Sequence, residues 1–266
     1  MKATLPRILV IRRRYLGDIV LLGSLFRNLR LHWPGARLAA LIEPVYHGVL
    51  AMNPDVDEVF AFPPRTRDWP RIVAQLRQSR FTHVLDLDNR EKTAVLARLT
   101  GAPIRITVRL GERLLLPAMY TQAERVPGGF LDGRHITDFY LHFLDLIDVP
   151  IVTRECRLAP RAEDLATVRE LLASFGAGTS GRRILVHPGS RSAWRVWPPQ
   201  NFAAVIDRLQ EKHNASAFII AGPGEQETVE AICRHARHPV HRIRQPLTVP
   251  QLAALFASFD LMLCHD

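Results

Sequence analysis

The sequence predicts an α/β protein built from parallel sheets that are covered by helices. Short β-branched runs alternate with longer segments in which apolar residues recur every three or four positions. This alternation occurs in two halves, and each half opens with a strand, a loop and a helix. We therefore expect two Rossmann-like domains facing a cleft, with ligands beyond the carboxyl ends of the strands.

The expected strands are short runs rich in Ile, Val and Leu. In the first half they are 8–12, 38–42, 57–61, 83–87 and 104–107, and in the second half 184–187, 217–221, 240–243 and 260–264.

Apolar stripes at helical spacing lie between several of these strands. One stripe runs from Ile19 to Trp33 and ends before Pro34-Gly35, and another runs from Ile136 to Ile147. Further helices are expected after Pro198-Pro199, near Glu225, and after Thr248, which forms a capping box with Gln251.

We expect the domain boundary in the segment that contains PRAED and GAGTSGRR. The predicted organisation is an N-terminal domain over 1–155, a linker over 156–182 and a C-terminal domain over 183–266. The chain ends directly after a strand, whereas a parallel strand is usually followed by a returning helix. We therefore expect the second domain to be incomplete.

The composition limits the class of protein. The net charge is +9, almost all from arginine, which favours an anionic partner, although a GC-rich genome also enriches arginine. Cys156, Cys233 and Cys264 lie far apart with no metal-ligand spacing, which is typical of a reducing compartment. No signal peptide and no transmembrane segment is evident, so we expect a cytoplasmic protein.

Four loops carry residues suited to chemistry. Asp18, after the first strand, is placed to act as a general base or only to cap a helix. Gly189 and Ser190 follow the first strand of the second half, where backbone N–H groups suit a diphosphate. Arg195 suits phosphate, unless it is a solvated residue beside a core tryptophan. Glu225 follows AGPG and suits a ribose diol, or the dipole of a helix.

Asp86-Leu87-Asp88 matches the DxD metal motif, but that pattern is very common by chance. It lies at a strand end within a regular α/β unit. We therefore expect no metal there.

Five segments in order resemble glycosyltransferase family 9, the bacterial lipopolysaccharide heptosyltransferases. They are ILVIRRRYLGD, ILVHPGSR, RVWP, IIAGPGE and LMLCHD. The resemblance implies a GT-B fold and inverting, metal-independent transfer of heptose from ADP-heptose to the lipopolysaccharide inner core at the inner membrane face. It implies no cofactor, with the ADP-sugar as co-substrate.

The same resemblance assigns roles to residues. Asp18 corresponds to the base, Arg195 to a lysine on the donor phosphates, Glu225 to the carboxylate on the ribose, and Asp266 to the acidic residue on the donor sugar. Arg12, Arg13 and Arg14 flank the expected cleft and are assigned to steering of a phosphorylated acceptor.

Two departures from the family pattern leave alternatives open. Arg195 replaces a lysine, and Arg14 and Tyr15 stand where small residues are common. Another nucleotide sugar, or an inactive fragment of the family, is compatible with the same motifs. A nucleic-acid-binding module would use the charge, but no recognised nucleic-acid motif is present.

Overall fold

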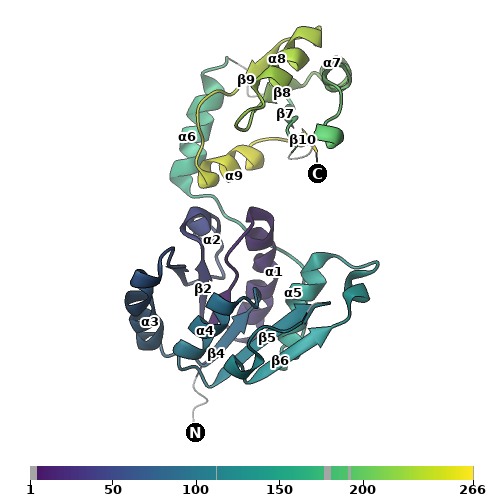
Figure 1. The fold of residues 1–266 in the computed structure, drawn as a ribbon. Helices are drawn as coiled ribbons and strands as arrows, with labels where there is room; N and C mark the ends of the chain where they lie inside the picture. The colour runs from purple at the N-terminus through teal and green to yellow at the C-terminus, as the bar shows by residue number, and fades with distance from the viewer. Residues whose placement is uncertain (1–4, 112, 177–180, 191–192, 266) are drawn as a thin grey trace. The chain divides into compact units, whose positions relative to one another are not determined.

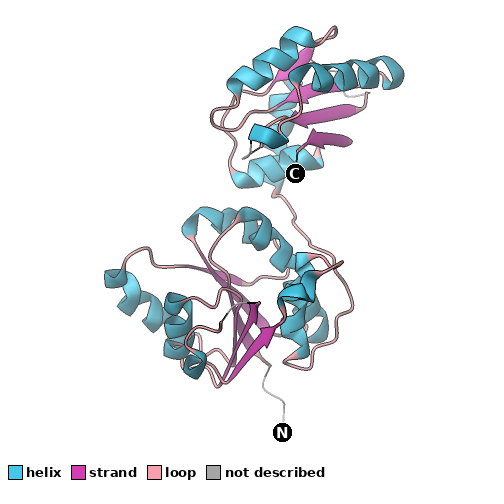
Figure 2. Ribbon diagram, turned by 45° about the vertical axis from the view of Figure 1, so that its right-hand side comes forward, coloured by secondary structure: helices cyan, strands magenta, loops and turns pink. Residues whose placement is uncertain are grey.

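The computed structural model describes residues 5–111, 113–176, 181–190 and 193–265, and the chain divides into two compact units, 1–159 and 160–266. In both units a parallel sheet lies between helices, as Figures 1 and 2 show. No helix within the described ranges has both the length and the apolar character needed to cross a bilayer.

The first unit contains a six-stranded parallel sheet in the order β3-β2-β1-β4-β5-β6. This is the strand order of the dinucleotide-binding fold, with the direction of winding reversing between β1 and β4. The strands are β1 (Arg7–Ile11), β2 (Arg37–Ile42), β3 (Glu58–Ala61), β4 (His83–Asp86), β5 (Ile104–Leu110) and β6 (Gln122–Val126).

Helices cover both faces of this sheet. The helices are α1 (Leu16–His32), α2 (His47–Leu50), α3 (Trp69–Gln78), α4 (Glu91–Leu99) and α5 (Ile136–Asp145). Leu9 and Ile11 of β1 pack in one core cluster with Ile72 of α3 and Leu96 of α4. Because neighbouring strand residues point to opposite faces, Ile8 and Val10 point to the other face, which α1 and α5 cover.

The second unit contains the parallel sheet β10-β7-β8-β9. In chain order its four strands repeat the arrangement 3-2-1-4 of the first unit. The strands are β7 (Arg183–His187), β8 (Ser216–Ile219), β9 (Val240–Arg242) and β10 (Leu261–Cys264). The helices are α6 (Ala162–Ala173), α7 (Pro199–His213), α8 (Gln226–His235) and α9 (Val249–Ala257).

Side chains along β7 and β8 alternate between the two faces of the second sheet, so the unit has a core cluster on each face. Ile184 and Ile219 pack with Phe202 of α7, while Leu185 and Phe218 pack with the helices of the opposite face. The capping box predicted at Thr248 and Gln251 is present at the start of α9.

The segment 156–182, expected as a linker, includes a helix that packs on the second sheet. It contains α6, whose Val168 and Leu172 are buried against the second sheet together with Leu255 of α9. The helix belongs to the second unit because its apolar face covers that sheet, and the unit boundary lies between residues 159 and 160.

Candidate active site

Asp18 lies in the first turn of α1, beyond the carboxyl end of β1. It does not cap the helix, since the N-cap position is Tyr15 and both carboxylate oxygens contact other side chains. Arg12 donates from Nη2 to Asp18 Oδ2 at 2.6 Å, and the Tyr140 hydroxyl donates a short hydrogen bond to Oδ1. The carboxylate is still 20% exposed. It is therefore oriented by two donors and open to a substrate.

The three arginines predicted to steer the acceptor have specific partners. Arg13 donates from Nε to Asp88 Oδ2 at 2.8 Å, and its guanidinium lies 4.9 Å from the centre of the Phe62 ring. Arg14 pairs with Glu43 at 2.8 Å and is mostly exposed. Arg12 and Arg13 are largely buried, so among the three Arg14 is the residue best placed to meet an approaching anion.

The DxD carboxylates also have their own partners. Asp86 is fully buried and accepts hydrogen bonds from the Tyr120 hydroxyl at 2.7 Å and from the amides of Asp88 and Asn89. Burial raises the pKa of the Asp86 carboxyl to about 6, against the opposing effect of the Tyr120 hydrogen bond. Asp86 therefore stabilises the loop after β4 through its hydrogen bonds, and Asp88 forms ion pairs with Arg12 and Arg13.

In the second unit, Glu225 occupies the N-cap position of α8, after β8. Its side chain caps no helix amide and turns back instead, accepting from the amide of Gly222 at 2.6 Å. His187, at the end of β7, places Nε2 3.3 Å from the same oxygen. The carboxylate is 24% exposed, so it remains reachable.

Gly189 is required next to this carboxylate. A Cβ atom at position 189 would lie 1.7 Å from Glu225 Oε1, and one at position 222 would lie 3.0 Å from Oε2. Glycine therefore lets the loop after β7 approach the loop after β8, and the Glu225 carboxylate fills the space.

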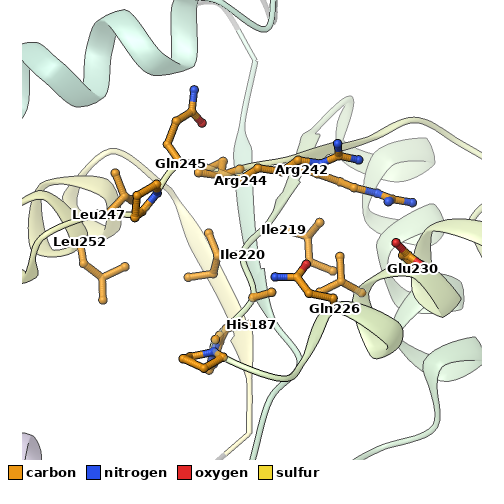
Figure 3. A pocket seen from close by; sticks show the side chains of 16 residues that line it. His187, Ile219, Ile220, Gln226, Glu230, Arg242, Arg244, Gln245, Leu247 and Leu252 are labelled. Carbon is orange, nitrogen blue, oxygen red and sulfur yellow. The ribbon is translucent and has the colours of Figure 1, made fainter.

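A cavity of about 850 Å³ opens beside these loops at the carboxyl ends of β8 and β9. Figure 3 shows Leu247 and Leu252 at one side of it and Gln226 with Glu230 at the other. His187 and Gly222, which contact Glu225, also line it. A cavity with an apolar wall and a polar rim has the size and character of a site for a small organic ligand.

The remaining predicted donor residues, Ser190 and Arg195, lie between β7 and α7. Ser190 follows Gly189, and Arg195 ends a 3₁₀ turn, η5 (Ala193–Arg195), with its guanidinium 4.7 Å from the centre of the Trp194 ring. Trp194 is 81% exposed, so the alternative of a core tryptophan at this position is wrong. Neither Ser190 nor Arg195 is among the described residues that line the cavity. The prediction for Asp266 lies outside the described residues.

Sequence reasoning missed several of these neighbours. Tyr140 was seen only as part of an apolar stripe, and nothing local links it to Asp18, which lies 122 positions earlier. Arg242 and Arg244 line the cavity from the end of β9 and were not singled out. His187 stands beside Gly189 in the predicted phosphate loop, so its position in the motif was the available signal.

Two Rossmann-like parallel-sheet units, each with polar groups beyond the carboxyl ends of its strands, are the architecture of the GT-B fold. The model of glycosyltransferase family 9 (heptosyltransferase) matches residues 69–266. The chain belongs to this family, which confirms the family resemblance, and it is a glycosyltransferase of the heptosyltransferase type.

Individual relatives of the same family match this chain at low sequence identity. Lipopolysaccharide heptosyltransferase 3 of Escherichia coli is 20% identical over 263 residues, which cover 95% of this chain and 76% of the relative. The solved glycosyl transferase family 9 protein of Veillonella parvula DSM 2008 is 21% identical with a TM-score of 0.86, covering 99% and 76% of the two chains. The Escherichia coli ADP-heptose lipopolysaccharide heptosyltransferase II is 18% identical with a TM-score of 0.77, covering 98% and 79%.

Proposed function

We propose that this chain transfers heptose from ADP-heptose to the inner core of lipopolysaccharide. Transfer would proceed with inversion and without a metal ion or other cofactor. The observation that carries the proposal is Glu225, a partly exposed carboxylate that contacts His187 and Gly222, two residues of a cavity large enough for a nucleoside. A solved relative, the Escherichia coli heptosyltransferase WaaC, carries ADP in its structure, which supports the choice of nucleotide.

The second unit would bind the donor. The cavity between Leu247, Leu252 and Gln226 would take the base, and Glu225 would accept hydrogen bonds from the ribose diol. The loop after β7, with Gly189 and Ser190, offers backbone N–H groups to the diphosphate. Arg195 would add positive charge there and stabilise the departing ADP.

The first unit would bind the acceptor and supply the base. Asp18 would take the proton of the acceptor hydroxyl while that oxygen bonds to the anomeric carbon. The bond from this carbon to the ADP oxygen breaks in the same displacement, and its electron pair leaves with ADP. A single displacement inverts the anomeric centre. The net charge of +9 and the exposed Arg14 favour a phosphorylated acceptor at the inner face of the membrane.

Metal independence is supported by the state of the DxD residues. A divalent cation would have to displace Arg12 and Arg13 from Asp88 and would meet their positive charge. The charge that develops on ADP is assigned to arginine and backbone N–H groups of the second unit instead.

Asp18→Ala tests whether the first unit supplies the base while the second unit binds the donor. Without a general base, transfer should fall by about 10²–10⁴-fold, while the affinity for ADP should stay unchanged because Asp18 belongs to the other unit. The assay measures the mass added to a deacylated inner-core acceptor, alongside calorimetry with ADP. Asp145→Ala, which changes an exposed carboxylate of the same unit, is the matched control. Equal loss of transfer and ADP binding, or full transfer in the variant, would show that Asp18 is not the base.

A further inference from the structure

Asp18 is held by a polar cluster drawn from three segments of the first unit. Arg12 comes from the loop after β1, Tyr140 from α5, and Asp88 from the loop after β4. Arg12 and Tyr140 each take one oxygen of the Asp18 carboxylate. With both oxygens held, the carboxylate has one fixed orientation.

The two donors are themselves fixed. Arg12 also donates from Nη1 to the carbonyl oxygen of Leu87 at 3.0 Å and to Asp88 Oδ1 at 3.3 Å. Its guanidinium lies 5.7 Å from the centre of the Tyr140 ring. The second oxygen of Asp88 accepts from Arg13, through Nε at 2.8 Å and through the backbone amide at 3.2 Å.

Tyr140 is 1% exposed and cannot turn toward solvent. Burial, and then the neighbouring Asp18 charge, raise the pKa of the Tyr140 hydroxyl, while Arg12 acts against this. The Tyr140 hydroxyl is therefore the donor in its hydrogen bond to Asp18.

Arg12 needs a second negatively charged partner when Asp18 is protonated, and Asp88 is placed to be that partner. When Asp18 takes a proton, Arg12 loses its partner charge, and a buried unpaired guanidinium is costly. Asp88, whose side chain is 8% exposed, remains beside Arg12 with a negative charge. The cluster can therefore hold Asp18 in both protonation states.

We propose that Tyr140 and Arg12 are positioning residues for the base, and that Asp88 balances the charge of Arg12 while Asp18 holds the proton. The inference rests on the proposed role of Asp18. It adds no covalent step, because the proton passes from the acceptor hydroxyl to Asp18 and ADP leaves with the electron pair of the broken bond.

Tyr140→Phe tests the proposal because it removes one hydroxyl and keeps the buried ring. We expect kcat to fall roughly ten- to hundredfold, as expected for loss of a hydrogen bond to a charged group. KM and ADP affinity should stay unchanged. The acid limb of the pH profile should move to higher pH, since a carboxylate that loses a donor holds its proton more tightly.

Tyr120→Phe is the matched control. It removes the same hydroxyl from a second buried tyrosine of this unit, one that contacts Asp86 at 2.7 Å rather than Asp18. We expect it to lower stability without moving the pH profile. Arg12→Met should move the acid limb in the same direction as Tyr140→Phe, and Arg12→Lys, which keeps the charge, should move it less.

Two further measurements separate the possible failures. Asp18→Asn should lower transfer by about 10²–10⁴-fold; if it keeps the wild-type rate, the proposed base itself is wrong. If Asp18→Asn shows this loss but Tyr140→Phe keeps the wild-type profile, or shifts it no more than Tyr120→Phe, only the positioning role is overturned. A carbon-13 carboxylate titration, with the Asp18 signal assigned by its loss in Asp18→Asn, needs no substrate. The midpoint of the Asp18 titration should move in Tyr140→Phe and not in Tyr120→Phe. A midpoint that stays unchanged in Tyr140→Phe overturns the proposal.

Discussion

Gly189→Ala should disable the donor site by displacing one carboxylate. The new Cβ atom would lie 1.7 Å from Oε1 and 2.0 Å from Cδ of Glu225, far inside van der Waals contact. The carboxylate is the mobile end of its side chain, so it should swing away rather than unfold the loop. It then loses the 2.6 Å hydrogen bond from the Gly222 amide.

The size of the effect follows from that lost contact. A hydrogen bond to a charged group contributes about 1.5–3 kcal/mol, and partial exposure of Glu225 places it at the lower end. If Glu225 contacts the ribose, ADP affinity should fall by a similar free energy, about 1.5 kcal/mol or roughly tenfold.

A double-mutant cycle with Glu225→Ala tests whether the effect of Gly189→Ala passes through this carboxylate. The three atoms nearest to the new Cβ all belong to the Glu225 carboxylate, so Gly189→Ala should change ADP affinity little once Glu225 is alanine. Calorimetry with ADP on the four proteins gives the coupling. Gly17→Ala, where a Cβ meets no atom within 4 Å, is the control and should leave ADP affinity unchanged. Additive losses in the double variant would refute the proposed displacement of Glu225.

Two further predictions concern stability. Folding holds the Asp86 proton more tightly than the unfolded chain does, since burial raises the pKa from 3.8 to about 6. This contribution is fully present below about pH 4 and is lost as the pH rises through about 6, a change of about 3 kcal/mol. Asp86→Asn should therefore gain about that much stability relative to wild type between pH 4 and pH 7 in urea unfolding; a constant difference would contradict the assignment. Thr248→Ala removes the N-cap of α9 and should cost about 1 kcal/mol, or about 2–4 °C in melting temperature, whereas Thr248→Ser should stay at the wild-type value.

Much of the fold could be predicted because its signals are local. Buried parallel strands such as β1 and β7 are continuous apolar runs, which are visible in any window of a few residues. Strand β6 was missed, since its sequence QAERV is mostly polar, as an edge strand permits. Helix α6 was assigned to a linker because PRAED at its start and GAGTSGRR after it indicate a domain boundary, although Val168 and Leu172 in it are buried.

The candidate site could be predicted in position but not in environment. Asp18 and Glu225 each lie beyond a strand end, as predicted, at the edge where ligands bind in this fold, and their roles stay predictions. Their partners are set by folding over long distances, as with Tyr140 on Asp18 and His187 on Glu225. The same limit explains Arg12 and Arg13, which look like a free basic cluster in sequence and pair with Asp88 once the loops after β1 and β4 meet.

Thermal unfolding with ADP, UDP and GDP measures whether the second unit binds an adenine nucleotide through Glu225, as we propose. At about 100 times its dissociation constant, a ligand adds about 2.7 kcal/mol, or roughly 5–10 °C for a protein of this size. We expect ADP to stabilise the protein more than the other two nucleotides do, and Glu225→Ala to lose most of that shift. Equal shifts with all three nucleotides, or an ADP shift that survives in Glu225→Ala, would contradict it.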